Sequence, residues 1–262
     1  MLSGEAAWDD VDAALDDHAA FIRSFVAEHS VQTNEVQRSW MVLPCFLEVS
    51  KRANLDEVDL VEIGPSAGLN RVWDRYRYRY ERGDWGRFDT GLELTGQERR
   101  AVPGELLRRR LRVASRVGVD SAPIDVTTAE GARLLKCFVW ADQTRRLEQL
   151  DRAIHALRED PPELIRGDAA TELPRLLAGE SDRLTIVLQT AVFGYIGAEG
   201  TKAICAALDD AAARRPLAYV GTHQPGEDVH THWALAVRVW PAEREFVAYG
   251  DFHGEWLDWI AG

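Results

Sequence analysis

The chain has 262 residues, of which 46% are hydrophobic and 28% charged. This is the composition of an ordinary globular protein and excludes a disordered, collagenous or disulfide-scaffold chain. Asp and Glu number 43 against 31 Lys and Arg, so the formal net charge is −12. Such a charge repels a phosphate backbone, which argues against nucleic acid as the main partner and favours a small-molecule substrate.

The sequence also gives no sign of a membrane span or a secretion signal. The longest apolar stretch, near Trp40–Leu47, contains Pro44 and is far shorter than the roughly 20 residues that cross a bilayer. The N-terminus is acidic where a signal peptide would be basic, and the three cysteines are widely spaced. We therefore expect a cytoplasmic protein with no membrane partner.

Two helices are predicted before the first strand. Apolar residues recur at helical spacing from Asp9 to His29. A second helix is predicted to begin at Asn34, with Gln37 as the partner of this cap, and to be kinked at Pro44. The chain is thus divided into a helical N-terminal cap over residues 1–56 and an α/β domain over residues 57–262.

Strands and helices alternate in the second part of the chain. The predicted strands are 58–63, 111–120, 164–169, 183–190 and 217–222, and the predicted helices include 128–158 and 203–214. This alternation indicates a parallel sheet. Two further strands, 233–240 and 245–249, are joined by a turn that contains Pro241 and are expected to be antiparallel.

The strongest local signal is a glycine turn at the end of the first predicted strand, Glu62-Ile-Gly-Pro-Ser-Ala-Gly68. Glycines let a backbone approach a ligand closely, and the free N–H groups that follow can bind an anion. Asp120 ends the second strand, where a carboxylate can accept ribose hydroxyls, and the third strand ends at Gly167-Asp168-Ala169. Over residues 58–222 this order resembles the S-adenosylmethionine site of Rossmann-like methyltransferases.

This resemblance implies a three-layer α/β sandwich of the Rossmann-like, class I methyltransferase type, with a helical cap, a terminal antiparallel strand pair and S-adenosylmethionine as cofactor. The residues assigned to cofactor binding are Glu62, Gly64, Ser66, Gly68, Asn70, Asp120, Asp168, Ala169 and Gln189. The sequence departs from the usual pattern at two points. Ser66 replaces the middle glycine, and about 50 residues separate Gly68 from Asp120, where about 20 are usual.

Longer strings are similar to a bacterial family, the domain of unknown function 2332. They are Gln32-Thr-Asn-Glu35-x-x-Arg38, Glu62-Ile-Gly-x-Ser-Ala-Gly-Leu-Asn70, Trp73-Asp-Arg-Tyr-Arg-Tyr78, Val139-Trp-x-Asp-Gln143 and His253-Gly-x-Trp256. The resemblance implies a methyltransferase-like fold but supplies no reaction. It also leads us to expect fewer N-terminal helices than longer members of the family carry.

Two alternatives use the same turn. Gly64-x-Ser66-x-Gly68 also matches the nucleophile elbow of serine hydrolases, with His253 late in the chain as the base. The segment before Ser66 is predicted to be helical, whereas a hydrolase elbow follows several strands, so this alternative is disfavoured. The glycines could also serve only the close packing of a helix on a strand.

Residues 71–112 form an insertion rich in arginine and tyrosine. Arg and Tyr alternate from Trp73 to Tyr80, so a strand here would place tyrosines on one face and arginines on the other. This pattern is typical of a surface for an aromatic or anionic substrate, and equally of a salt-bridged flank facing the acidic N-terminal helix. A non-catalytic binding module could act through the same face.

The acceptor side of the site is assigned to residues of two kinds. The candidate proton acceptors are Glu35, Tyr76 and His253, and the candidate substrate contacts are Asn34, Arg38, Trp73, Tyr78 and Trp140. His230 and His232 could face one metal ion, but no Cys pair or carboxylate cluster accompanies them, so no metal is predicted. The sequence as a whole favours a methyltransferase that acts on a small molecule, with a binding module or a serine hydrolase as alternatives.

Overall fold

A computed structural model describes residues 8–89, 91–224 and 231–262. Within these residues a nine-stranded sheet has the strand order β5-β12-β11-β10-β9-β8-β1-β6-β7. Its strands are β1 (Glu57–Ile63), β5 (Gln97–Arg100), β6 (Arg112–Asp120), β7 (Glu163–Arg166), β8 (Leu184–Gln189), β9 (Leu217–His223), β10 (Trp233–Val239), β11 (Glu245–Gly250) and β12 (Trp256–Trp259).

The five strands from β7 to β9 are parallel to one another, and β1 lies at their centre. Counted along the chain, their spatial order is 3-2-1-4-5, the order of a Rossmann-like sheet. Every residue of β8 is buried, as is typical of parallel strands covered on both faces. The predicted α/β, Rossmann-like class is confirmed, and ligands of such sheets bind beyond the carboxyl ends of the strands.

The remaining strands extend this sheet in a different pattern. β10 is antiparallel to both β9 and β11, which confirms the predicted terminal pair, and β12 follows antiparallel to β11. The insertion contributes β5, which pairs parallel with β12. It also forms a separate small sheet of β2 (Arg77–Tyr80), β3 (Gly83–Gly86) and β4 (Glu93–Thr95).

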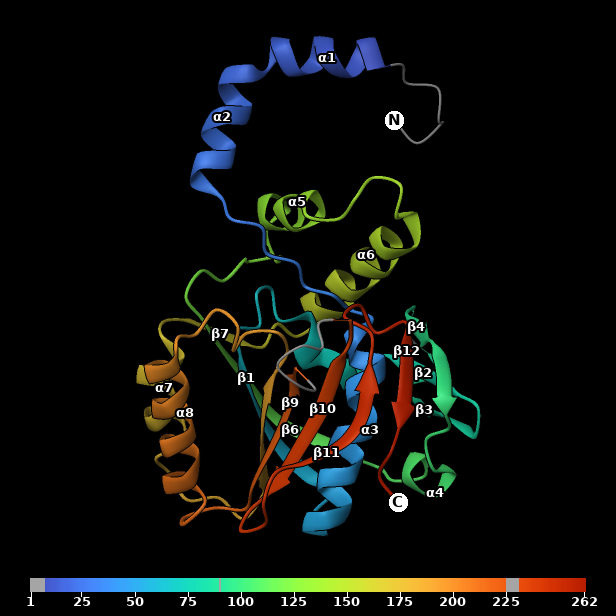
Figure 1. Cartoon of the computed structure of the whole chain (residues 1–262), viewed down its shortest axis with the longest axis vertical. Coiled ribbons are helices and arrows are strands. Elements are labelled where there is room, and N and C mark those ends of the chain that lie inside the picture. Colours follow the sequence, from blue (N-terminus) through green and yellow to red (C-terminus); the bar gives the residue numbers. More distant parts are fainter. Residues whose placement is uncertain (1–7, 90, 225–230) are drawn as a thin grey trace.

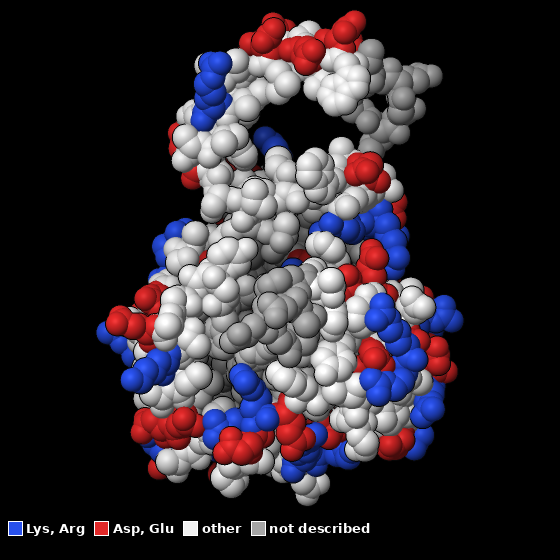
Figure 2. Space-filling model, viewed as in Figure 1, with Lys and Arg blue, Asp and Glu red and all other residues white. Residues whose placement is uncertain are grey.

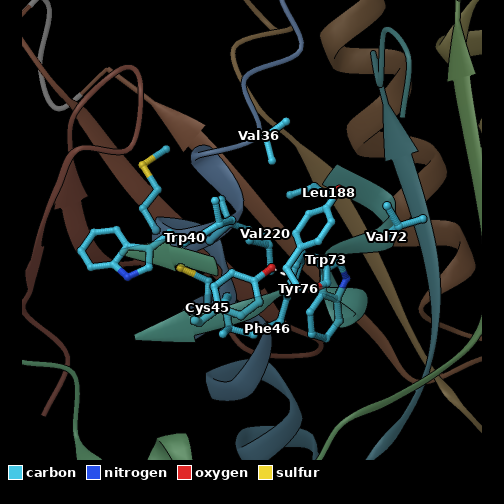
Figure 3. Packing of buried hydrophobic residues seen from close by; sticks show 14 of the residues in the cluster. Val36, Trp40, Cys45, Phe46, Val72, Trp73, Tyr76, Leu188 and Val220 are labelled. Carbon is cyan, nitrogen blue, oxygen red and sulfur yellow. Dashed lines mark hydrogen bonds between the residues drawn. The ribbon is translucent and has the colours of Figure 1, made fainter. Parts of the chain in front are cut away.

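Helices cover both faces of the large sheet, which gives the expected three layers (Figure 1). On one face lie α7 (Ala169–Leu176) and α8 (Ala198–Ala211), which share one apolar cluster with β1, β8 and β9. On the other face lies α3 (Arg38–Ala53), followed by the 3-10 helix η1 (Leu69–Arg75). Aromatic side chains from α3 and the insertion pack against one another in the core on this face of the sheet (Figure 3). They include Trp40, Phe46, Trp73 and Tyr76.

The N-terminal segment differs from its prediction. Instead of one helix over 9–29 there are two, α1 (Trp8–Asp17) and α2 (Ala19–Glu28), and neither has a buried residue. In contrast, α3 is buried from Ser39 to Ser50 and is a layer of the α/β body, although the predicted cap included it. Pro44 lies inside this helix.

The helix predicted over 128–158 is also divided. It forms α5 (Ala129–Cys137) and α6 (Thr144–Arg158), and the predicted cap Thr128 accepts a hydrogen bond from the Gly131 backbone N–H at 3.0 Å. A short α4 (Gly104–Leu107) lies in the insertion. In the described ranges no helix has the length and hydropathy that a bilayer crossing needs.

Candidate functional site

A cleft of about 600 Å³ opens where four distant segments of the chain meet. These are the segment just before α3, the β4–β5 turn, the first half of α6 and the β11–β12 turn. Its volume is in the range of small-molecule sites. The lining is mostly polar: Glu35, Gln37, Thr95, Gly96, Gln97, Gln143, Arg145, Arg146, Gln149, His253 and Glu255.

Gln37 joins the walls of the cleft. Its side-chain amide donates to the carbonyl oxygens of Thr95 at 3.1 Å and Gly254 at 3.2 Å. Its side-chain oxygen accepts from the Gln149 amide at 3.0 Å. Gly254 has a φ of +81°, and a Cβ there would collide with the Gln37 backbone. The hydrogen bonds of the buried Gln37 side-chain amide therefore connect three of the segments that form the cleft.

Glu35 lies at the base of the cleft and is only 5% exposed. Its carboxylate forms an ion pair with Arg146, and the His253 Nδ1 atom lies 3.6 Å from its Oε2 atom. Burial alone would raise the pKa of Glu35, but the contact with His253 and the charges of Arg146 and Arg38 outweigh burial and lower it. Glu35 is thus a carboxylate at neutral pH.

His253 stands over this carboxylate with 53% of its side chain exposed. The Glu35 charge favours the tautomer with its proton on Nδ1, which leaves Nε2 as an acceptor for a ligand in the cleft. The backbone N–H of His253 donates to the Asp251 carboxylate at 2.7 Å, which fixes the turn that carries it. The two residues predicted separately as proton acceptors are therefore brought together as one pair.

Arg38 lies beside this pair on the first turn of α3. Its Nε donates to the Phe252 carbonyl at 2.9 Å, and its guanidinium lies 4.7 Å from the centre of the Trp233 ring. Burial lowers the pKa of Arg38 to about 10, while Glu35 opposes that shift. The side chain stays charged at neutral pH and adds to the positive field around Glu35.

The cleft is next to the glycine turn. The Asn34 side-chain oxygen accepts from the Leu69 backbone N–H at 2.9 Å, so the prediction that Asn34 caps α3 is wrong. Gln37 precedes α3 and makes no side-chain cap bond. One residue into the helix, the Ser39 hydroxyl donates to the Asn70 side-chain oxygen at 2.9 Å. These two bonds connect the segment that carries Glu35 to the loop after β1.

The turn itself has the strained backbone that its glycines suggested. Gly64, Ser66 and Gly68 all have positive φ values, and Ser66 is the one residue of the three with a side chain. The Asp120 carboxylate accepts from the backbone N–H groups of Ser66 at 2.8 Å and Ala122 at 2.9 Å. The ends of β1 and β6 are thereby locked together.

Three of the residues assigned to the cofactor fit a polar ligand at this edge of the sheet. The buried Ser66 hydroxyl has no hydrogen-bond partner in the described part of the chain. Asp120 lies beside it at the tip of β6. Asp168 uses one carboxylate oxygen to cap α7 at the Ala170 N–H, 2.8 Å away, and is otherwise exposed next to the buried Ala169. Three polar side chains therefore lie at the carboxyl ends of β1, β6 and β7, the edge of a Rossmann-like sheet where ligands bind.

Three other assigned residues serve the interior instead. Glu62 is 1% exposed and faces Arg71 at 3.7 Å, and burial raises its pKa to about 7. Gln189 is fully buried and donates to the Tyr219 hydroxyl and the Thr222 carbonyl. Asn70 is 5% exposed and accepts the bond from Ser39. None of these side chains is presented to a ligand.

The aromatic residues of the insertion are also misassigned. Tyr76, Trp73 and Tyr78 have no exposed surface, and the Tyr76 hydroxyl donates to the Leu69 carbonyl at 2.8 Å. The predicted alternation is real, because tyrosines of this stretch point into the core and Arg77 and Arg79 point outwards. The tyrosine face packs in the core and does not face a ligand, because burying the large aromatic rings stabilises the fold.

The arginine face and Trp140 lie outside the site. Arg77 forms ion pairs with Asp84 and Glu93, so the salt-bridged flank is made within the insertion. Trp140, predicted to contact substrate, is 76% exposed in the segment between α5 and α6 and does not line the cleft.

The hydrolase alternative finds no support. Among the described residues the Ser66 hydroxyl has no hydrogen-bond partner, and His253 faces Glu35. No group of three or more His, Cys, Asp or Glu residues in those ranges could hold a metal ion. His230 lies outside the described residues. Burial lowers the pKa of His223 to about 4, so this ring is a neutral partner of the Tyr219 hydroxyl.

Sequence reasoning missed Arg146, Gln37 and Gln149 as functional residues. Arg146 neutralises Glu35, and the two glutamines bond to each other across the cleft. Arg146 and Gln149 lie on α6, and the apolar spacing of this segment predicts only which face of the helix is buried. A signal was present at Gln143, the last residue of the Val139-Trp-x-Asp-Gln string, because its side-chain oxygen accepts from Arg146.

Comparisons with known proteins give a family but no activity. Residues 2–259 match the family described as "Uncharacterized protein conserved in bacteria (DUF2332)", so the chain belongs to that family. No curated protein matches. The chain is similar to the crystal structure of an S-adenosylmethionine-dependent methyltransferase from Clostridium acetobutylicum ATCC 824, at 11% identity over 92% of this chain and 78% of that one. The TM-score is 0.32, too low for this likeness to support a function.

Proposed function

We propose that this member of the DUF2332 family is an enzyme that transfers a methyl group from S-adenosylmethionine to a small polar molecule bound in the cleft. The observation that carries the proposal is the convergence on one place of Glu35, Arg146 and His253, next to a glycine turn at the carboxyl ends of parallel strands. A buried, ionised carboxylate beside a half-exposed histidine in the wall of a polar cleft is an arrangement that can orient the histidine as a base.

The chain's own groups account for proton removal from the acceptor. His253 lines the cleft, and with Nδ1 turned to Glu35 its Nε2 atom would be the group that takes the proton. Glu35 holds the ring and stabilises the imidazolium that forms when the proton is taken. Arg146 and Arg38 keep Glu35 ionised, so that this carboxylate does not itself take the proton.

The cofactor would be held at the turn. Gly64, Ser66 and Gly68 would contact its methionine part, Asp120 the ribose and Asp168 the adenine edge. When bound, S-adenosylmethionine supplies an electrophilic methyl group. The protein's task is then to align the acceptor atom at roughly 3 to 3.5 Å and to exclude water.

The test is a thermal melt of the full, extensively dialysed chain with S-adenosylmethionine and S-adenosylhomocysteine, with NAD and ATP as controls. Ligand at 100 times its Kd stabilises by about 2.7 kcal/mol, which raises the Tm by several degrees for a chain of this size. A selective rise supports the proposal. No rise, with no binding by calorimetry, would overturn it and favour the non-catalytic binding module.

A further inference from the structure

The N-terminal helices leave large apolar side chains exposed. Trp8 is 80% exposed, Phe21 68% and Val26 67%, and no residue of α1 or α2 is buried. Each helix has ten residues, and isolated helices of this length are marginal in water because nucleation is costly. This arm, residues 8–28, therefore needs a surface to pack against.

A second exposed apolar feature lies in the segment between α5 and α6, residues 138–143. Trp140 is 76% exposed, and Phe138 and Val139 beside it are partly buried. The arm stands over α5 and the start of α6 (Figure 1). The segment that joins the arm to α3, residues 29–37, has no helix and contains Glu35.

The charges of the two parts are opposite. The arm has six acidic residues and one arginine, whereas residues 129–158 have six basic and four acidic residues. Figure 2 shows acidic side chains gathered on α1 and basic ones over α6. Two arms of separate molecules would repel each other, so charge favours α5–α6 over a second arm as the partner.

We infer that the arm packs on the α5–α6 segment through Phe21, Val26 and Trp140 and so acts as a lid over the cleft. Arg145 and Arg146 on α6 line the cleft, so an arm lying across α6 would cover its mouth. Closure of this kind excludes water and commits a substrate. The inference rests on the proposed function only in naming the cleft as the reaction centre.

Hydrogen exchange of the full chain tests the lid without any ligand or activity. We expect amides of residues 19–28 to exchange at least about tenfold more slowly than in an unprotected chain, because docking stabilises helices that are marginal alone. Trp140→Ser should remove most of this protection. Asp142→Ser, an exposed change two residues away that removes a negative charge, should not reduce it.

Three results would overturn the inference. The first is an unprotected arm in the unaltered chain, and the second is protection that Trp140→Ser leaves intact. The third is protection that grows with protein concentration, which would show that a second copy covers the arm. Phe21→Ser with Val26→Ser provides the reciprocal variant, and melting curves of each variant show that the body stays folded. None of these readouts depends on cofactor binding, so failure of the lid and failure of the proposed function are distinguishable.

Discussion

Two buried carboxylates, Glu62 at the glycine turn and Glu35 in the cleft, have pKa values shifted in opposite directions. Glu62 is fully enclosed, so burial dominates and raises its pKa to about 7, with a further rise from the Asp120 charge that Arg71, 3.7 Å away, and Arg38 oppose. Glu35 is almost as buried, but Arg146, Arg38 and His253 surround it and lower its pKa. The balance between burial and the charges near each carboxylate decides the direction, and it separates a structural carboxylate from one kept ionised beside a histidine.

The largest effect is expected from removing the cation next to Glu62. Arg71→Met would leave Glu62 without its partner inside the protein, and breaking such a pair costs about 3–5 kcal/mol. Urea unfolding at pH 8 measures the loss. Adding Glu62→Gln to Arg71→Met should restore part of the stability, whereas equal losses in the single and double variants would show that the pair does not matter.

A smaller loss is expected from the residue that joins the cleft walls. Gln37→Ala leaves the buried Gly254 carbonyl oxygen without its partner, which costs about 1–3 kcal/mol, whereas the part-buried Thr95 carbonyl oxygen can bond to water instead. Gln97→Ala, an exposed change in the same cleft, is the matched control and should stay within about 0.5 kcal/mol. Equal stability of both variants would contradict the role given to Gln37.

The turn should tolerate no side chain at Gly68. Its φ is +83°, and a Cβ would collide with the Arg71 guanidinium. Gly68→Ala should therefore cost about 1–2 kcal/mol for the left-handed backbone alone, with the collision in addition. Gly91→Ala meets nothing within 4 Å and serves as the control. A Gly68→Ala chain as stable as the control would mean that the turn can relax.

The two carboxylates should give opposite dependences of stability on pH. The pKa of Glu62 is raised on folding, so the folded state holds its proton more tightly and stability falls as the pH rises from its ordinary value of 4.5 to about 7. The pKa of Glu35 is lowered, so its contribution is present above 4.5 and is lost as the pH falls through the folded pKa. The free energies of unfolding of Glu62→Gln and Glu35→Gln, measured across pH 3–8, should each lose the pH dependence due to the replaced carboxylate. If both substitutions removed the same part of the pH dependence, the shifts would not be opposite.

The sequence predicted well what depends on local pattern. Hydrophobic periodicity located β1, β8 and β9, and the glycine spacing located a turn whose φ values are positive. Glu35 and His253 were identified by residue type, and the structure brings them within 3.6 Å. Their pairing could not be read from the sequence, because 217 residues lie between them.

The errors have a common physical cause. Tyr76 and Trp73 are residue types that suit a binding surface, but they also bury more apolar area than most side chains. Both therefore pack in the hydrophobic core beside α3. Glu62 and Gln189 lie at strand ends where a ligand would bind, yet Glu62 faces Arg71 and Gln189 donates hydrogen bonds to Tyr219 and Thr222 inside the protein. A pattern within one segment does not show which of its side chains will contact a distant segment of the chain.

The most direct test of the proposed function is calorimetric titration of S-adenosylhomocysteine into the unaltered chain, Asp120→Asn and His253→Ala. If the cofactor binds at the turn and proton transfer takes place in the cleft, as we propose, the unaltered chain should bind it. Binding to Asp120→Asn should be at least about tenfold weaker, since a charge-assisted hydrogen bond is worth about 1.5–3 kcal/mol, and binding to His253→Ala should be unchanged. Binding that is absent from the unaltered chain, or that is lost with His253 and kept without the Asp120 charge, would contradict the proposed function.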